Sequence, residues 1–136
     1  MKRDRPTQNG LSDAISIAKS RGAVFFFTRT KDCPADFEIT SANRVAIVCV
    51  KRSRRLHCTL AEIEKTFSEP IRRFRSFPTP ENHCRELWLW SPYGVFRFFR
   101  VGNEGIVEID RDGNPLVVPA PGTSTDAKLA AVENAG

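Results

Sequence analysis

Two neighbouring stretches whose side chains alternate with period two constrain the fold of this chain most. Residues 35–40 (ADFEIT) and 44–51 (RVAIVCVK) have this pattern, and only a short polar link separates them. Successive side chains of a strand point to opposite faces, so Asp36 and Glu38 are expected on one face of the first strand. Lys51 ends the second strand. The sequence therefore predicts a hairpin in which an acidic face meets a lysine.

Further strands are expected on both sides of this hairpin in the sequence. Residues 23–30 (AVFFFTRT) are rich in β-forming residues and apolar on both faces, which predicts a strand covered on both sides. With the next two strands it forms an antiparallel meander. Turn residues then separate three more β-rich stretches, at residues 85–90, 95–101 and 106–109. The sequence therefore predicts a mixed, largely antiparallel sheet.

Two helices are expected beside the sheet. Apolar or small residues recur at helical spacing over residues 11–21, and a glycine follows them. Thr59 and Glu62 have the spacing of a capping box, which predicts the start of a second helix over residues 59–76. Pro70 lies inside that pattern and is expected to kink or split the helix. The fold class expected is therefore α+β, with the sheet flanked by helices.

The length of 136 residues fits one domain. Residues 1–10 contain Pro6 and Asn9-Gly10, which break regular structure, so a flexible lead-in is expected there. Residues 11–118 are expected to form the domain, and residues 119–136, which are small and polar, a disordered tail. No apolar stretch approaches the roughly 20 residues of a membrane span, and no export signal is evident. A cytoplasmic location away from membranes is expected.

Positive charge is concentrated in the middle of the chain. Between Arg44 and Arg75, nine Lys and Arg stand against three Glu, whereas the net charge of the whole chain is +5. A basic stretch of this kind suits a polyanion such as nucleic acid. A solvated basic surface without a partner would show the same pattern.

The four cysteines show no CxxC pair, and they are expected to be reduced thiols. Two dipeptides, His57-Cys58 and His83-Cys84, together offer the residue types of a Cys₂His₂ zinc site. Zinc ligands are normally two to four residues apart, however, and adjacent residues on a strand point to opposite faces. Reduced thiols are therefore the favoured interpretation.

The chain resembles a known nuclease superfamily in one motif and in the order of its elements. Pro34 precedes Asp36 on one strand, with Ala35 between them, and the next strand carries Cys49-Val50-Lys51. This resembles the PD-(D/E)XK superfamily, in which an aspartate follows a proline and (D/E)-X-K lies on the next strand. The order of helix, three strands, basic helix and strand also resembles that superfamily. The restriction-endonuclease-like fold is implied, and the Holliday-junction resolvase-like members are the most similar.

The resemblance implies a metal-dependent endonuclease that acts on DNA, with structured or branched DNA as the expected substrate. Asp36 and the backbone carbonyl of Val50 are then expected to bind Mg²⁺ or Mn²⁺. Lys51 is expected to stabilise the charge that develops on the phosphate.

The second carboxylate of the motif is missing, because Cys49 occupies its position. A thiol does not replace a hard oxygen ligand of Mg²⁺. Glu38 is one candidate for the missing ligand, since it is expected to share a face with Asp36. Glu62 and Glu64 of the second helix are also candidates. Glu62 is preferred for its position near the helix start, although its capping-box role competes with metal binding, and Glu64 has the fewest structural demands. If none of them serves, the catalytic site is lost.

Nucleic acid is the expected partner, with DNA favoured over RNA. The side chains expected to hold its phosphate backbone are Arg52, Arg54, Arg55, Arg72 and Arg73. The resemblance also implies a homodimer, because two strands are cut. The alternative function is that of a catalytically inactive nucleic-acid-binding or subunit protein built on the same fold. A third alternative is a protein-interaction domain unrelated to nucleic acid, which arginines scattered over several faces would favour.

Aromatic residues interleave with arginines over residues 88–100. Such a surface can stack unpaired bases. The commoner use of these residues is the core face of a sheet, and both interpretations are open from the sequence.

Overall fold

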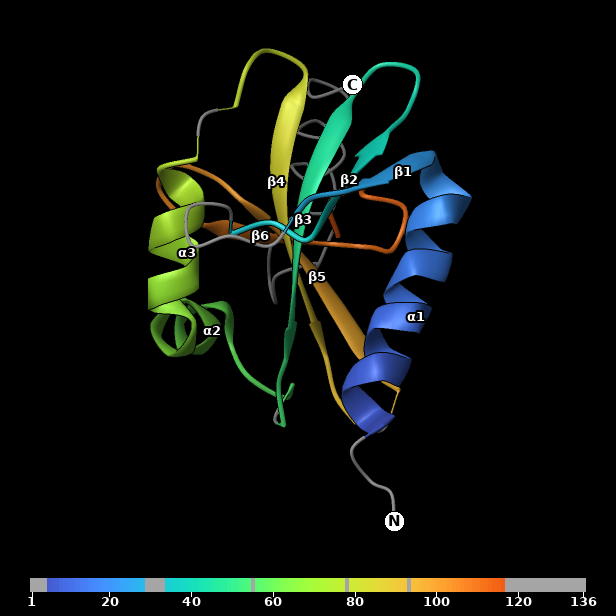
Figure 1. Cartoon of the computed structure of the whole chain (residues 1–136). Helices are drawn as coiled ribbons and strands as arrows, with labels where there is room; N and C mark the ends of the chain where they lie inside the picture. The colour runs from blue at the N-terminus through green and yellow to red at the C-terminus, as the bar shows by residue number, and fades with distance from the viewer. Residues whose placement is uncertain (1–4, 29–33, 55, 78, 93, 117–136) are drawn as a thin grey trace, which may run out of the picture.

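The computed structural model describes residues 5–28, 34–54, 56–77, 79–92 and 94–116. This part of the chain forms a single sheet in the order β1-β2-β3-β4-β5-β6, in which only β3 and β4 pair in parallel. One helix covers one face of the sheet and two short helices cover the other (Figure 1). The α+β class and the mixed, largely antiparallel sheet are therefore confirmed. The elements are α1 (Arg5–Arg21), β1 (Ala23–Phe26), β2 (Phe37–Thr40), β3 (Val45–Arg52), α2 (Leu60–Thr66), α3 (Ser68–Arg75), β4 (His83–Trp90), β5 (Phe96–Val101) and β6 (Ile106–Ile109).

The first three strands form the expected antiparallel meander. The β1 strand ends at Phe26, earlier than the apolar pattern of residues 23–30 predicted, and part of that stretch lies outside the described residues. After β3 the chain passes through α2 and α3 before it returns as β4, beside β3 and parallel to it. A helical crossover of this kind is what a parallel pair of strands requires.

The α1 helix begins at Arg5, several residues before the expected start. Pro6 lies in its first turn, where a missing N–H costs no helical hydrogen bond. Gly10 packs against an indole: a Cβ built on it would lie 2.2 Å from Cε2 of Trp90. The glycine that suggested a break in the sequence therefore allows close packing of the helix on β4. The rest of the expected lead-in and the expected tail from residue 119 lie outside the described residues.

The second expected helix is split in two, as the proline predicted. Thr59 caps α2 in a capping box, because its side chain accepts from the Glu62 backbone and the Glu62 side chain accepts from the Thr59 N–H at 2.9 Å. The break falls at Phe67, before the proline itself. The ring of Pro70 would clash with the carbonyl four residues earlier, that of Thr66, and α2 ends at that residue. Pro70 then lies in the first turn of α3.

Two apolar layers hold the sheet between the helices. Beneath α1, the rings of Phe37, Trp88 and Phe98 meet edge to face, with centroids 5.6 and 5.0 Å apart. On the other face, side chains of α2 and α3 such as Ile63 and Phe74 pack on β4 and β5. The aromatic residues of β4 and β5 thus use their rings largely in the core, and Trp88 is fully buried. Base stacking by Trp88 is therefore excluded in this fold.

No helix in the described part of the chain combines the length and the apolar character needed to cross a bilayer.

Candidate nucleic-acid interface and the expected nuclease site

Asp36 lies at an irregularity in the pairing of β2 with β3. Phe37 faces Val48 in the register of the two strands, yet the Asp36 N–H also donates to the Val48 carbonyl, at 2.8 Å. Two successive residues opposite one partner form a β-bulge. The Asp36 carboxylate then accepts the N–H of Val50, with 2.7 Å between Oδ2 and N. The side chain therefore replaces a backbone bond of the ladder at the point where the bulge interrupts it.

The bulge changes which side chains share a face. Ala35, and not Asp36, packs with Ile47 and Cys49 in the layer beneath α2 and α3. The alternation that predicted a common face for Asp36 and Glu38 is thus interrupted at the bulge. An extra residue in one strand shifts its side chains by one position relative to the neighbouring strand.

Glu38 and Lys51 lie on one face of the sheet but apart from each other. Glu38 faces Ile47 of β3, and Lys51 follows four residues later on that strand. At roughly 3.3 Å per residue, this places them about 13 Å apart along the strand. The Glu38 carboxylate accepts from the Thr40 hydroxyl at 3.4 Å. The Lys51 side chain is exposed and makes no hydrogen bond or ion pair with any described residue.

The positions expected to supply the second carboxylate have structural roles of their own. Cys49 is only 2% exposed and belongs to the core beneath α2 and α3. Glu62 forms the capping box of α2. Glu64, expected to have the fewest structural demands, instead accepts the Ile106 N–H at 2.9 Å and lies 3.9 Å from the Arg75 guanidinium. That expectation about Glu64 is wrong.

The expected oxygen donors do not converge on one point for Mg²⁺ or Mn²⁺ in the described part of the chain. Mg²⁺ requires oxygen ligands in near-octahedral geometry. Among the described residues, no three His, Cys, Asp or Glu side chains come together as a potential metal site. The structure brings Asp36 to Val50, but through the Val50 N–H, and not through the carbonyl that the resemblance implied.

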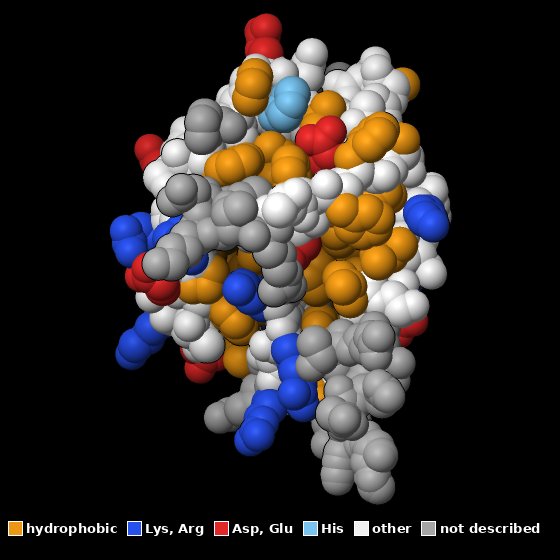
Figure 2. Space-filling model, in the orientation of Figure 1, with side chains coloured by type: hydrophobic (Ala, Val, Ile, Leu, Met, Phe, Trp, Pro, Cys, Tyr) orange, Lys and Arg blue, Asp and Glu red, His pale blue; other side chains and the backbone are white. Residues whose placement is uncertain are grey.

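Two of the expected DNA-binding residues, Arg52 and Arg54, form a basic group at the end of β3 with Lys51, which was expected to be catalytic. We name Lys51, Arg52 and Arg54 the β3-end cluster; all three are exposed, and the Arg52 guanidinium lies over the Trp90 ring at 6.0 Å from its centroid. Figure 2 shows Lys and Arg side chains gathered at the lower end of the molecule, where β3 ends in Figure 1. Arg55 lies outside the described residues.

The remaining expected DNA-binding residues belong to α3 and form a separate group. Arg72 and Arg73 are exposed, and the Arg72 guanidinium bonds Glu69 one turn earlier, at 2.6 Å. In Figure 2 basic side chains also project at the left, on the side where α3 lies in Figure 1. The acidic neighbour reduces the positive charge that Arg72 can offer to a phosphate.

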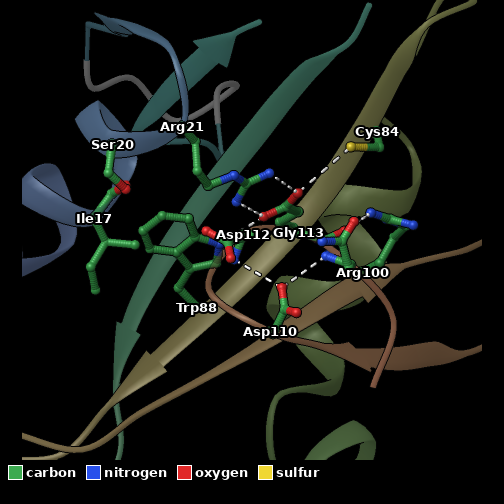
Figure 3. A network of polar contacts seen from close by, with 11 residues as sticks. Ile17, Ser20, Arg21, Cys84, Trp88, Arg100, Asp110, Asp112 and Gly113 are labelled. Atoms are coloured by element: carbon green, nitrogen blue, oxygen red, sulfur yellow. Dashed lines mark hydrogen bonds and ion pairs between the residues drawn. The ribbon is translucent and has the colours of Figure 1, made fainter. Parts of the chain in front are cut away.

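A buried ion pair on the opposite face of the sheet was not predicted from the sequence. Glu86 of β4 is fully buried and binds both terminal nitrogens of Arg21, at 2.8 and 2.9 Å. The Trp88 indole donates to the same carboxylate at 2.9 Å. Burial by itself raises the pKa of Glu86, but the hydrogen bonds and charge of Arg21 outweigh it and hold that pKa below its usual range. Figure 3 shows Arg21 reaching from the end of α1 toward Trp88 and Cys84.

A polar cleft of about 380 Å³ lies beside this ion pair. Its walls are the end of α1, the β2–β3 turn and the turn that follows β6. Its charged lining residues are Arg21, Arg44 and Asp112. Because Arg21 is neutralised by Glu86, the cleft presents one arginine and one aspartate of opposite charge.

No known protein-family profile matches this sequence, and no curated protein is significantly similar to it.

Proposed function

We propose that this protein binds nucleic acid, DNA in preference to RNA, through the β3-end cluster and does not cut it. The observation that carries the proposal is the cluster itself: three exposed cations within four residues at the end of one strand. Lys51 and Arg54 form no ion pair with any described residue, so their charge is available to phosphates. The net charge of +5 also attracts nucleic acid, over longer distances.

The proposed fold is the restriction-endonuclease-like one. Its support is the order of elements: a helix, three antiparallel strands, a helical segment and a fourth strand parallel to the third. This order is the one that the resemblance to the PD-(D/E)XK superfamily implied. The β4–β5–β6 meander extends the sheet beyond these four strands.

A binding role is preferred to a catalytic one because the residues expected to supply the second carboxylate have structural roles. The position of the missing carboxylate is a buried thiol, Cys49. Glu62 and Glu64 hold the start of α2 and the start of β6. A nuclease fold that has kept its basic surface and lost its metal ligands accounts for all of these features.

The proposal is tested by fluorescence anisotropy with labelled branched and linear DNA over a range of salt concentrations. Each phosphate contact contributes about 0.9 to the slope of log affinity against log salt. Arg54→Ala is therefore expected to weaken binding and to lower this slope by about 0.9. Arg111→Ala, which removes the same charge from the turn after β6, is the matched control and is expected to leave the slope nearly unchanged. Salt-independent binding, or an equal loss of DNA affinity in Arg54→Ala and Arg111→Ala, would contradict the proposal.

A metal-dependent endonuclease is the second candidate. The observation that favours it is that Asp36 is held against β3 by the Val50 N–H, one residue before the exposed Lys51. Branched DNA is incubated with the protein and Mg²⁺ or Mn²⁺, and cleavage and binding are scored together. Asp36→Asn keeps an acceptor for Val50, so it should preserve the fold and abolish cleavage. Binding without cleavage by the unaltered protein would eliminate this candidate.

A further inference from the structure

The β1 strand forms one edge of the sheet, and its outer backbone groups make no hydrogen bond to any described residue. In an antiparallel ladder, alternate residues turn both backbone groups toward the partner strand. The Phe27 N–H donates to the Asp36 carbonyl of the neighbouring segment at 3.1 Å. By alternation, Phe25 also faces β2, and Val24 and Phe26 turn their N–H and C=O outward. None of the described residues bonds these outward groups.

The opposite edge of the sheet, β6, is covered by the chain that follows it. The Leu116 N–H donates to the Glu108 carbonyl at 3.1 Å, and Ile109 forms a bridge with Pro115. This segment occupies outward positions of β6 as a further strand would. Of the two edges in the described structure, β1 is thus the one left available for pairing.

The side chains of β1 are also suited to association. Phe25 and Phe26 are 57% and 59% exposed, and they point to opposite faces of the strand. The strand sequence AVFF contains no charged residue. Edge strands of soluble proteins are usually protected by charge, proline, a bulge or a covering segment. The β1 strand has an exposed apolar residue on each face and contains neither charge nor proline, and no described segment pairs with its outer edge.

The strand is complementary to itself about Phe25. If a second copy approaches in antiparallel orientation, Val24 of each copy faces Phe26 of the other, and these residues exchange all four outward backbone bonds. Phe25 then faces Phe25 of the second copy in a non-hydrogen-bonded pair, where the two Cα atoms are about 4.5 Å apart. The two exposed rings meet at a two-fold axis, as a closed isologous interface requires.

We infer that two copies of this chain associate through β1 and join their sheets into one continuous sheet across this axis. The strand pairing supplies the register, and the Phe25 and Phe26 rings supply the apolar contact on the two faces. The inference is independent of the proposed function, because the β1 edge contains none of the residues assigned to nucleic-acid binding.

Sedimentation velocity and light scattering of the full chain over a range of concentrations test the inference. The unaltered protein is expected to shift from monomer to dimer as its concentration rises. Phe25→Lys and Phe25→Glu should each remain monomeric, because like charges then meet at the axis. An equimolar mixture of the two variants should recover the dimer, since opposite charges now meet. Val107→Lys, which changes a 51% exposed residue of β6, is the matched control and should still dimerise.

A backbone variant tests the strand pairing separately from the side chains. Val24→Pro removes an outward N–H and leaves the bonds between β1 and β2 in place, so it should abolish the dimer while circular dichroism stays native. A protein that remains monomeric at every concentration would overturn the inference, and so would a dimer that persists in Phe25→Lys and Val24→Pro. Failure of the mixed charge variants to associate would refute the register about Phe25.

Discussion

Replacing Glu86 with glutamine tests whether the buried ion pair stabilises the fold. Glu86 is fully buried and the Arg21 side chain is 9% exposed, so the substitution leaves a guanidinium in the protein interior without its counter-ion. Removing one partner of a buried pair typically costs about 3–5 kcal/mol. Glutamine retains the size of the side chain and one acceptor oxygen for Arg21 or for the Trp88 indole. We therefore expect Glu86→Gln to lower the free energy of unfolding by an amount near the lower limit, about 3 kcal/mol at neutral pH.

The loss is measured by urea unfolding, followed through the fluorescence of the two buried tryptophans, and it should depend on pH. The pKa of Glu86 lies below its usual range in the folded protein, so folding favours the charged carboxylate. This contribution is complete above the unfolded-state pKa, about 4.3, and is lost as the pH falls through the lower folded-state pKa. The difference in stability between the unaltered protein and Glu86→Gln should therefore be largest near pH 7 and shrink below about pH 4.

Two controls distinguish the ion pair from a general effect of substitution. Glu69→Gln removes the carboxylate of the exposed pair with Arg72 and should change stability little. The double variant Arg21→Met with Glu86→Leu removes both charges and should recover much of the stability that the single change loses. A loss below about 1 kcal/mol for Glu86→Gln at pH 7, or no recovery in the double variant, would refute the reasoning.

Three further predictions concern single residues. Thr59→Ala removes the cap of α2 and should lower the free energy of unfolding by about 1 kcal/mol, and an unchanged urea midpoint would contradict the cap's contribution. Gly10→Ala places a methyl group 2.2 Å from the Trp90 ring and should lower the free energy of unfolding by about 1–3 kcal/mol. An unchanged melting temperature would contradict this. Burial and the nearby Glu86 carboxylate raise the pKa of the Cys84 thiol, so iodoacetamide should modify it slowly at neutral pH. Rapid modification of Cys84, detected by mass spectrometry, would contradict this.

The features that could be predicted from the sequence depend on residues close together in the chain. The capping box joins residues three positions apart, and the proline acts on a carbonyl four positions earlier. The meander depends on alternation within single strands and on short links. In each case the physical cause lies within one or two turns or strands, so the local pattern was sufficient.

The candidate site was less predictable because its geometry depends on the pairing between strands. Alternation alone does not show that Asp36 and Phe37 both face Val48, so the interruption of the shared face became visible only in the register. The pair of Arg21 and Glu86 joins residues 65 positions apart. In the sequence, Arg21 has a sufficient local explanation as a cation at a helix C-terminus, which concealed its longer-range partner.

The break at Phe67 has a consequence for how the chain folds. It divides the crossover into helices of seven and eight residues, and isolated helices of that length are unstable in water. Neither helix can therefore act as a preformed nucleus, and both must gain their order while docking on the sheet. Since β4 reaches β3 only through this crossover, we expect the parallel pairing and both helices to form in one cooperative step. A peptide of residues 59–76 should accordingly show little helical circular dichroism by itself.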